Sequence, residues 1–560
     1  MKLKSALSQR QARIPAALLL TALGVYIAAT EGYLTNLHAG AVSGAIAAAL
    51  AFVTGRALFS ASTIAATTML IVAIAFIKRE RSDFILHAWD FFEPAQWGFP
   101  VVEIAGQQPY ALMALLLALL VLVFALPVLW RYERPNVSRI FCACAFVVLV
   151  GLSGYFSALK GEPRHMQYTW ADRNLSSFYS SWPEAIEALR RGFLFDVGEA
   201  GSAIARLDQA PACAPQNRRP HIILIHQESV TPPMPFAPAL SFDPGLADFF
   251  KSHDGRVHKL RVETYGGGSW LTEFSVLTGM ASRFFGGMQQ FVQVYMAGRI
   301  DDALPAALAR CGYRNVMFYP YLKGFFGSSK FFESIGLKEI FDLKAQKAPT
   351  SMEQDRFYYY NALDEIARHK QGSQQPLFLY VQTMAAHWPY DVTYWPERKV
   401  AGAPGASAEI HEYLRRLAMS KEDYEGFSAA LGQRFPDERF LIVQYGDHQP
   451  LATRSFFGFD NQEIEDINGA LPENSSAFET YFSVNAINFD PPPLPQTPAL
   501  DAAYLGAILF EQARLPMPDS WRARLALMAH CNGRYATCAD RAAVLAFHRK
   551  LVDSGLVRAR

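Results

Sequence analysis

The chain has 560 residues, of which 51% are hydrophobic, 13% aromatic and only 18% charged, an apolar composition for a soluble enzyme. The formal net charge of +1 argues against a general nucleic-acid-binding protein, because following a phosphate backbone requires a surplus of basic residues. The length allows several domains, and the composition indicates a protein partly embedded in a membrane. We expect no nucleic-acid partner.

The apolar residues are concentrated in the first 160 positions. Five runs there contain no charged residue, and each approaches or exceeds the roughly 17–25 residues that a helix needs to cross a bilayer. The runs cover residues 14–30, 39–55, 57–77, 110–130 and 140–159. Buried core helices are the alternative, but no such run follows residue 160. We therefore predict a transmembrane region of five helices over residues 1–160.

The first run has two interpretations. The basic residues before it resemble the charged region of a cleaved signal peptide, but we favour a retained anchor. Basic residues mark the cytoplasmic side, which is then the side of the N-terminus and of the loop after the fourth span. These basic residues are Lys2, Lys4, Arg10, Arg13, Arg131, Arg134 and Arg139. Everything after residue 159 then lies outside, which predicts a multi-pass protein of the bacterial inner membrane with a periplasmic catalytic domain.

One loop disagrees with this orientation. Lys78, Arg79 and Arg81 follow the third span and lie outside if the N-terminus is inside. Glu80 and Asp83 partly offset their charge, so we keep the five-span arrangement.

The cysteines agree with an oxidising compartment. Cys142 and Cys144 lie within a span and point to different helix faces. The other four all follow residue 160, and an even number suits disulfides outside the cytoplasm. We expect Cys531–Cys538 because its loop is short, and Cys213–Cys311 follows by elimination.

The part after the spans divides into a polar connector and a folded domain. Residues 161–219 are polar and Pro-rich, with a helix predicted near residues 182–194. From residue 220 to 560, short β-branched runs alternate with helical patterns, which is typical of an α/β domain with a mostly parallel central sheet. We expect strands at 221–229, 257–265, 314–320, 376–383 and 439–447, and helices at 301–311, 361–370 and 409–435. Ligand sites in such folds lie at the carboxyl ends of the strands.

Acidic residues and a histidine end two of these strands. Glu228 follows the first strand, and Asp447 with His448 leaves the last. Carboxylate oxygens and an imidazole nitrogen suit a divalent cation. The plain alternatives are a helix cap or solvated acid for Glu228, and a turn aspartate with an exposed histidine for the pair.

Ser269 follows three glycines, 266–268, and precedes a helical stretch. Glycines allow close backbone approach and a helix N-terminus stabilises an anion, so a serine there can attack phosphorus. Serine before a helix is also a common N-cap. His387 follows the strand at 376–383, where a lone histidine is often structural. Four such clusters at strand ends of one domain nevertheless predict a metal site that activates Ser269.

The ordered motifs ES, GGGS-x-x-x-EF-x-x-LTG, H-x-P-Y and GDH resemble the sulfatase-like branch of the alkaline phosphatase superfamily. The similarity is greatest to lipoteichoic acid synthases and periplasmic-glucan phosphoglycerol transferases, which also place five spans before an extracytoplasmic catalytic domain. The resemblance implies one divalent metal ion, Mn²⁺ before Mg²⁺ or Zn²⁺, and a contact of His387 with the substrate phosphoryl or leaving group. The implied metal ligands are Glu228, Ser269, Asp447 and His448.

Two departures from the family pattern concern the nucleophile and the headgroup. The family's nucleophile is usually threonine, and Ser269 preserves the hydroxyl. A family arginine that binds the phosphoglycerol headgroup is replaced near Ser328, where Lys323 or Lys330 substitutes without the bidentate fork of arginine. We keep Lys330 with His387 as the substrate-binding residues.

The resulting prediction is a phosphoglycerol-type transferase with a phospholipid donor, a glycan or lipid A acceptor, and a phospho-Ser269 intermediate. The alternatives are a phosphoethanolamine transferase and a sulfatase-like hydrolase, although the formylglycine motif Cys/Ser-x-Pro-x-Arg is absent. A non-catalytic scaffold is disfavoured because all four metal-ligand candidates are present. A transporter is disfavoured because the spans show neither paired repeats nor intramembrane charges.

Overall fold

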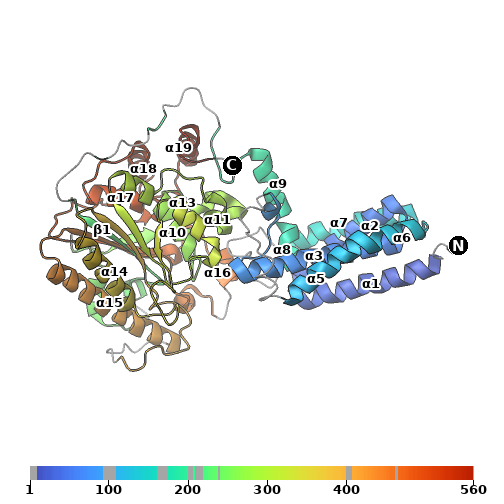
Figure 1. The fold of residues 1–560 in the computed structure, drawn as a ribbon, viewed down its shortest axis with the longest axis horizontal. Coiled ribbons are helices and arrows are strands. Elements are labelled where there is room, and N and C mark those ends of the chain that lie inside the picture. Colours follow the sequence, from blue (N-terminus) through green and yellow to red (C-terminus); the bar gives the residue numbers. More distant parts are fainter. Residues whose placement is uncertain are drawn as a thin grey trace. The chain divides into compact units, whose positions relative to one another are not determined.

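The computed structural model describes residues 9–82, 84–92, 109–160, 174–199, 206–208, 213, 219–236, 240–398, 407–460 and 464–558. The chain forms two compact units, Met1–Arg191 and Gly192–Arg560, which are described separately (Figure 1). Lys2, Lys4, Asp83 and part of the predicted connector lie outside the described residues. The change of unit at Gly192 falls within that connector.

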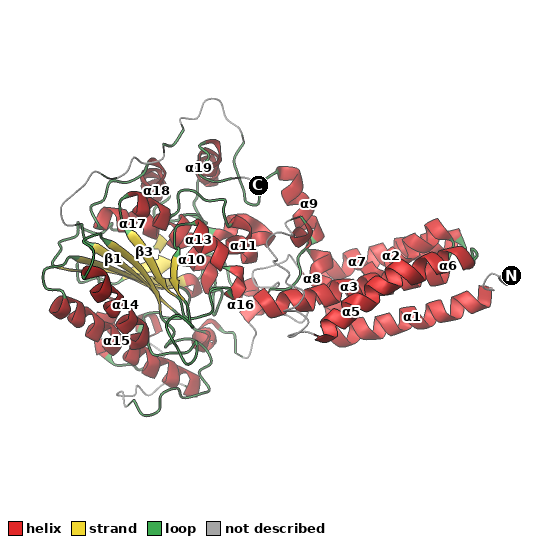
Figure 2. Cartoon of the chain, in the orientation of Figure 1, coloured by secondary structure: helices red, strands yellow, loops and turns green. Residues whose placement is uncertain are grey.

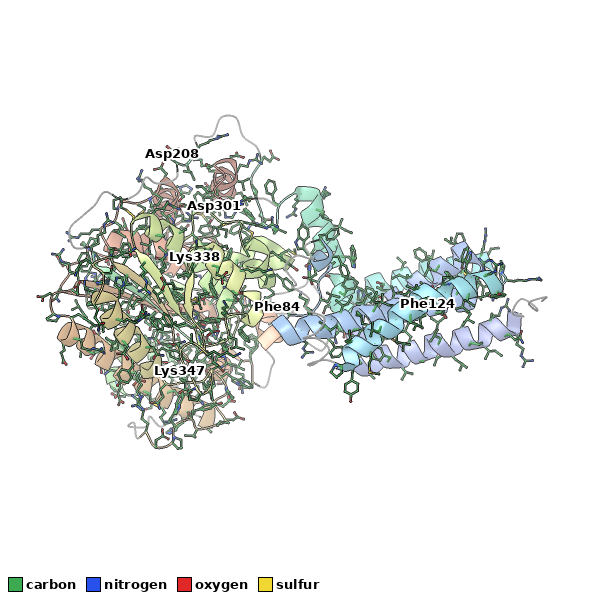
Figure 3. The ribbon with its side chains drawn as sticks, viewed as in Figure 1. Phe84, Phe124, Asp208, Asp301, Lys338 and Lys347 are labelled. Carbon is green, nitrogen blue, oxygen red and sulfur yellow. A yellow bond between two sulfur atoms is a disulfide. The ribbon has the colours of Figure 1, made fainter. Side chains whose placement is uncertain are left out.

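The first unit is helical and apolar. Five of its helical stretches are long and apolar enough to cross a membrane: Arg10–Thr30, Leu34–Thr54, Ala57–Arg79, Leu112–Tyr132 and Arg139–Leu159. Many of their apolar side chains point outward, as the exposed Phe124 does (Figure 3). In a soluble domain such side chains would face water, so their exposure suits a lipid environment. The helices are α1 (Gln9–Thr30), α2 (Tyr33–Thr54), α3 (Ala57–Ser82), α5 (Pro109–Leu120), α6 (Leu126–Tyr132), α7 (Arg139–Lys160), α8 (Asn174–Ser180) and α9 (Trp182–Arg191).

The fourth span contains a local irregularity. A π-helical turn, Val121–Ala125, joins α5 to α6. Pro127 follows at the start of α6 and has no N–H to donate, which removes one helical hydrogen bond and explains the wider turn.

The start of α3 is held by residues that follow the fourth span. The buried carboxylate of Glu133 accepts the N–H groups of Leu58 at 2.9 Å and Phe59 at 2.7 Å. The side chain of Asn136 accepts the N–H of Ala57 at 3.1 Å. Three otherwise unsatisfied helix donors are therefore satisfied from a loop more than 70 residues away.

Lys78, which disagreed with the predicted orientation, is paired inside the first unit. Its Nζ donates to Asp90 at 2.6 Å and to the carbonyl of Ile85 at 2.9 Å. The sequence predicted that Glu80 and Asp83 offset the positive charge of this loop. For Lys78, the negative charge comes from Asp90, which lies 12 positions further along the chain.

The second unit is a three-layer α/β domain, which confirms the predicted fold class (Figure 2). Its eight-stranded sheet has the order β4-β3-β5-β1-β6-β7-β2-β8. The strands are β1 (His221–Gln227), β2 (His258–Arg261), β3 (Arg314–Phe318), β4 (Glu339–Phe341), β5 (Leu377–Gln382), β6 (Phe440–Gly446), β7 (Glu479–Ile487) and β8 (Leu500–Asp501). All five predicted strands are present, although β2 is shorter than expected, and β4, β7 and β8 were not predicted. Only β7 is antiparallel to its neighbours β6 and β2.

Helices cover both faces of this sheet. The long α14 and α15 pack on one face, where alternate strand residues such as Ile223, Leu379 and Ile442 form the main apolar core. Figure 1 shows α14 and α15 on one side of the strands and α17 and α18 on the other. The helices are α10 (Ser269–Thr278), α11 (Val292–Met296), α12 (Leu304–Arg310), α13 (Ser329–Ser334), α14 (Asp355–Lys370), α15 (Ala408–Arg434), α16 (Ile464–Ala470), α17 (Leu505–Gln512), α18 (Asp519–His530) and α19 (Arg541–Asp553).

Both expected disulfides, Cys213–Cys311 and Cys531–Cys538, are formed. Cys142 and Cys144 remain free. The second disulfide closes a loop around Tyr535, whose ring is fully buried.

Candidate metal and nucleophile site

The carboxyl ends of β1 and β6 are adjacent because these two strands pair in parallel, with Gln227 opposite Gly446. Glu228 and Asp447 each follow directly, so both acids leave the sheet at one edge. Both side chains are buried. The alternatives of a solvated acid for Glu228 and a turn aspartate for Asp447 therefore do not describe these residues.

The helix α10 brings Ser269 to the same point. Gly268 takes the N-cap position with a left-handed φ of 82°, which favours glycine. Ser269 is thus the first helical residue and is not the cap. Its Oγ donates to Oε2 of Glu228 at 2.9 Å and lies 3.3 Å from Nε2 of His448. The N-terminus of α10 adds a site for an anion beside this hydroxyl.

His448 completes the cluster. Its Nε2 lies 3.4 Å from Glu228 and 3.3 Å from Asp447. Burial alone lowers the pKa of His448, but the two carboxylates outweigh it and raise the pKa to about 9. Burial likewise raises the pKa of Glu228, yet the hydrogen bond with His448 and nearby histidine charges hold it well below its usual range. The site therefore favours an ionised Glu228 carboxylate next to a positive charge.

A buried oxygen of Asp447 provides a test of whether a metal ion fits. Its Oδ1 accepts the N–H groups of Ser229 and His448, each at 2.8 Å. Its Oδ2 is buried and has no aligned hydrogen-bond donor within the described part of the chain. An oxygen that faces a cluster of oxygens and two imidazoles, those of His226 and His448, with no aligned donor of its own, fits a divalent cation.

His387 lies in the loop after β5 and is half-exposed. Its charge contributes to the lowered pKa of Glu228, which places it within electrostatic range of the site. The loop is anchored by Arg416 of α15, whose fully buried guanidinium donates to the carbonyls of His387 at 2.6 Å, Pro389 at 2.7 Å and Val392 at 2.8 Å. No local sequence pattern pointed to Arg416, because its partners are not neighbours in the chain.

Lys330 lies on α13, where its side chain is exposed. Its contact with the substrate stays a prediction. Ser328, which stands near the position of the family arginine, is buried and donates to Oε1 of Gln293 at 2.7 Å. Its hydroxyl is therefore committed to the interior of the domain.

His226 is a site residue that the sequence analysis missed. His226, Glu228 and Asp447 each offer a ligand atom within 4.8 Å of the others, and all three are buried. The residues His226–Ser229 read HQES, and only Glu228 among them was predicted as a metal ligand. His226 belongs to the apolar run that forms the strand.

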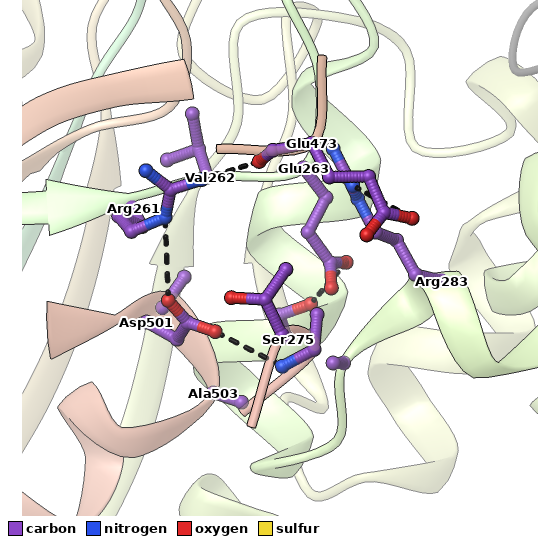
Figure 4. A pocket seen from close by; sticks show the side chains of 12 residues that line it. Arg261, Val262, Glu263, Ser275, Arg283, Glu473, Asp501 and Ala503 are labelled. Carbon is purple, nitrogen blue, oxygen red and sulfur yellow. Dashed lines mark hydrogen bonds and ion pairs between the residues drawn. The ribbon is translucent and has the colours of Figure 1, made fainter. Parts of the chain in front are cut away.

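A second polar pocket lies at the ends of β2 and β8 (Figure 4). Arg261 donates to the carbonyl of Glu473 at 2.6 Å and lies 3.8 Å from Asp501. Asp501 accepts the N–H groups of Tyr535 and Ala536 at 2.6 and 3.0 Å. None of the predicted site residues lines this pocket. Its polar groups join β2 and β8 to the loop closed by the second disulfide.

Comparison with known proteins gives the class of the domain. The sulfatase family model matches residues 261–475, a range that contains Ser269, His387, Asp447 and His448. The matched range lies within the second unit, and the match confirms the resemblance to sulfatase-like proteins that the motifs predicted. An uncharacterised protein of Haemophilus influenzae is 26% identical over 346 residues, which cover 58% of this chain and 59% of that protein.

Three solved structures are similar in fold. The phosphoglycerol transferase GacH of Streptococcus pyogenes, in complex with sn-glycerol-1-phosphate, is 17% identical over 62% of this chain and 89% of its own, with a TM-score of 0.47. The lipoteichoic acid synthase LtaP of Listeria monocytogenes is 14% identical over 57% and 76%, with a TM-score of 0.42. The lipooligosaccharide phosphoethanolamine transferase EptA of Neisseria meningitidis is 11% identical over 89% and 95%, also with a TM-score of 0.42.

Proposed function

We propose that this protein is a metal-dependent phosphotransferase of the bacterial inner membrane, with its catalytic domain in the periplasm. It transfers a phosphoglycerol-type headgroup from a phospholipid to a cell-envelope glycan. The observation that carries the proposal is the position of Ser269 Oγ, at the N-terminus of α10 and 2.9 Å from Glu228. A hydroxyl, two carboxylates and an imidazole at one point form a site for phosphoryl transfer rather than for simple binding.

Glu228, Asp447, His448 and Ser269 are the residues that would hold the metal ion, with Mn²⁺ expected before Mg²⁺ or Zn²⁺. A bound divalent cation polarises the phosphoryl oxygens and lowers the pKa of the serine hydroxyl. Asp447 is suited to this role because its Oδ2 has no aligned donor among the described residues.

In the first step, Ser269 Oγ attacks the phosphorus of the lipid headgroup. The Oγ–P bond forms as the bond from phosphorus to the diacylglycerol oxygen breaks, and the serine proton, which Glu228 accepts at 2.9 Å before the reaction, passes to solvent water. Protonated His387 gives its proton to the departing alkoxide. The N–H groups at the start of α10 stabilise the charge on the phosphoryl oxygens.

In the second step, a glycan hydroxyl attacks the phosphoserine. His387 takes the proton of that hydroxyl, the P–Oγ bond breaks, and solvent water returns a proton to Ser269. Protons therefore balance over the cycle, and both histidine and serine regain their starting states. The apolar helices of the first unit keep the enzyme in the membrane that contains its lipid donor.

The test is to incubate the protein with radiolabelled phosphatidylglycerol or phosphatidylethanolamine and to trap the label on the chain. We expect label on Ser269 from phosphatidylglycerol, and none in Ser269→Ala. Ser275→Ala is the matched control, since Ser275 lies on the same helix with its hydroxyl bonded to Glu263 at 3.2 Å. Label in Ser269→Ala would overturn the nucleophile assignment.

The two donors also separate the alternatives. Label from phosphatidylethanolamine alone would make the protein a phosphoethanolamine transferase. Ser328, which stands near the position of the family arginine, donates to Gln293 and does not supply the headgroup contact of that arginine. Release of sulfate from a sulfate ester without labelling from either lipid would favour a sulfatase-like hydrolase.

A further inference from the structure

His226 lies next to the proposed metal site, beside Asp447. It is the sixth residue of β1, two positions before Glu228, and its side chain is fully buried. Its Nδ1 lies 2.8 Å from the hydroxyl of Tyr380 on β5 and 3.1 Å from the hydroxyl of Tyr445 on β6. Its Nε2 lies 3.1 Å from Oδ2 of Asp447. Both ring nitrogens are thus directed at polar groups on neighbouring strands.

The contacts of His226 continue into the helix that carries the nucleophile. Tyr380 donates to Oε1 of Glu273 at 2.8 Å, and the other oxygen of Glu273 accepts Gln293 Nε2 at 2.7 Å. Glu273 and Tyr380 are buried. Glu273 follows Ser269 by four residues on α10, about one helical turn, and so lies on the same face of that helix. The network therefore joins the helix of Ser269 to the carboxylate of Asp447.

A second link fixes the same two elements. The hydroxyl of Thr272 on α10 donates to the carbonyl of Asp447 at 2.7 Å. Thr272 thus holds the backbone of Asp447, whereas the network through Glu273, Tyr380 and His226 reaches its side chain. Together they set where the carboxylate lies relative to Ser269.

The polarity of this network requires an explanation. The same face of the sheet carries Leu224 and Val443 beside His226, and burying polar groups there costs free energy unless every group is bonded. The hydrogen bonds are satisfied at the Tyr380 end, but His226 Nε2 and Asp447 Oδ2 face one another at 3.1 Å without an aligned hydrogen bond. This pair lies at the proposed metal site, where the ring of His226 limits the positions that Oδ2 of Asp447 can take.

We infer that His226 is a positioning residue, which holds Oδ2 of Asp447 in the orientation that a divalent cation requires. Tyr380, Tyr445 and Glu273 fix the imidazole ring for this purpose. The inference rests on the proposed metal site and adds to it a residue that contacts a ligand rather than the ion. Removing such supporting residues costs about 10- to 100-fold in metal affinity.

The competing assignment makes His226 a direct ligand, because its Nε2 belongs to the group of ligand atoms within 4.8 Å. The two assignments differ in the number of imidazoles bound to the ion. Electron spin-echo spectroscopy of the Mn²⁺-loaded protein counts coordinated histidine nitrogens. Positioning predicts one imidazole, from His448, in the wild type and in every His226 variant. Two imidazoles in the wild type and one in His226→Leu would overturn the inference.

Calorimetric titration of the full-length protein with Mn²⁺ in detergent tests the effect on affinity. We expect His226→Leu to raise the Kd by about 10- to 100-fold and His226→Gln, which restores an N–H donor, to recover part of the loss. Tyr380→Phe removes only the hydroxyl that holds the ring, and we expect it to raise the Kd by about fivefold. It keeps the inference testable if His226→Leu does not fold.

Tyr535→Phe is the matched control. Tyr535 is also a buried tyrosine whose hydroxyl contacts a buried histidine, His548, at 2.9 Å, but neither residue contacts the proposed site. We expect its Kd for Mn²⁺ to equal that of the wild type. An unchanged Kd in both His226→Leu and Tyr380→Phe would overturn the role of His226 alone. A wild-type protein that binds neither Mn²⁺, Mg²⁺ nor Zn²⁺ would overturn the metal site, and the inference with it.

Discussion

Ser269 Oγ lies 2.9 Å from Oε2 of Glu228, although 41 residues separate the two in the chain. The contact joins the first turn of α10 to the end of β1, and it orients the serine hydroxyl by giving its hydrogen a fixed acceptor. A nucleophile held in this way leaves its oxygen lone pairs free for attack.

Headgroup transfer should require a hydroxyl at position 269. We expect Ser269→Thr to retain activity within about tenfold of the wild type, because threonine keeps the hydroxyl and position 269 is only half-buried. Ser269→Ala should lose about a thousandfold or more in kcat. Initial rates of headgroup transfer measure both. Equal activity of the alanine and threonine variants would contradict the role of the hydroxyl.

Metal removal should destabilise the second unit as well as abolish turnover. The buried carboxylates of Glu228 and Asp447 then lie 3.4 and 3.3 Å from the buried His448 with no cation between them. A ligand at 100 times its Kd stabilises by about 2.7 kcal/mol, so chelation should lower the Tm and Mn²⁺ should restore it. Glu228→Gln should show a much smaller restoration. A Tm that does not respond to either treatment in the wild type would exclude a metal with this role.

The guanidinium of Arg416 should govern the position of His387. Arg416→Leu leaves three loop carbonyls without this donor and removes one of the donors to Glu412, which Arg415 still pairs, at a cost of about 1–3 kcal/mol. Arg416→Lys keeps the positive charge but not the planar guanidinium that donates to several carbonyls at once. We therefore expect a smaller loss of stability and a clear fall in kcat, because the loop of His387 is no longer held in place. Tm and initial rates separate the two effects. Arg558→Leu, on an exposed ion pair with Asp301, is the control.

The carboxyl of Asp355 should make stability depend on pH. Burial, with the nearby Asp423, raises the pKa of Asp355 to about 6, while its Oδ1 accepts the N–H groups of Met384 and Ala385. The native state therefore keeps a proton that the unfolded chain loses near pH 4, so this carboxyl stabilises the fold at low pH. Its contribution, about 2–3 kcal/mol, is lost as the pH rises from about 4 to about 6.

Asp355→Asn tests this dependence. Asparagine accepts the same two backbone N–H groups but does not ionise, so the variant should lack the decline between pH 4 and pH 6. The difference in Tm between variant and wild type at pH 4.5 and pH 6.5 isolates Asp355 from His221 and His548, whose pKa values are lowered to about 4 by burial in both proteins. A constant difference would contradict the raised pKa.

Glu133 should stabilise the helical unit. Glu133→Ala removes the acceptor of two N–H groups at the start of α3 and of the Asn136 amide, which costs about 1–3 kcal/mol. Thermal unfolding in detergent measures the change in Tm. Glu133→Gln keeps one acceptor oxygen and should be intermediate, whereas Glu187→Gln, on an exposed face of α9, should match the wild type.

The sequence by itself determined the apolar helices, the alternation of strands and helices, and the residues at the strand ends. These features depend on periodicity and on short motifs, which are local properties of the chain. Asp447, for example, directly follows an apolar run, and the parallel pairing of such strands is enough to predict that it lies near Glu228.

Only the tertiary structure decided which side chains support these residues. His226 reads as part of an apolar strand until the fold sets it beside Tyr380, 154 positions away, and Asp447. Ser328 stands near the position of the family arginine, and only the fold places Gln293 where it accepts the hydrogen bond of the Ser328 hydroxyl. The reason is physical: a buried polar side chain takes its partners from neighbouring strands and helices, and their separation along the chain carries no local signal.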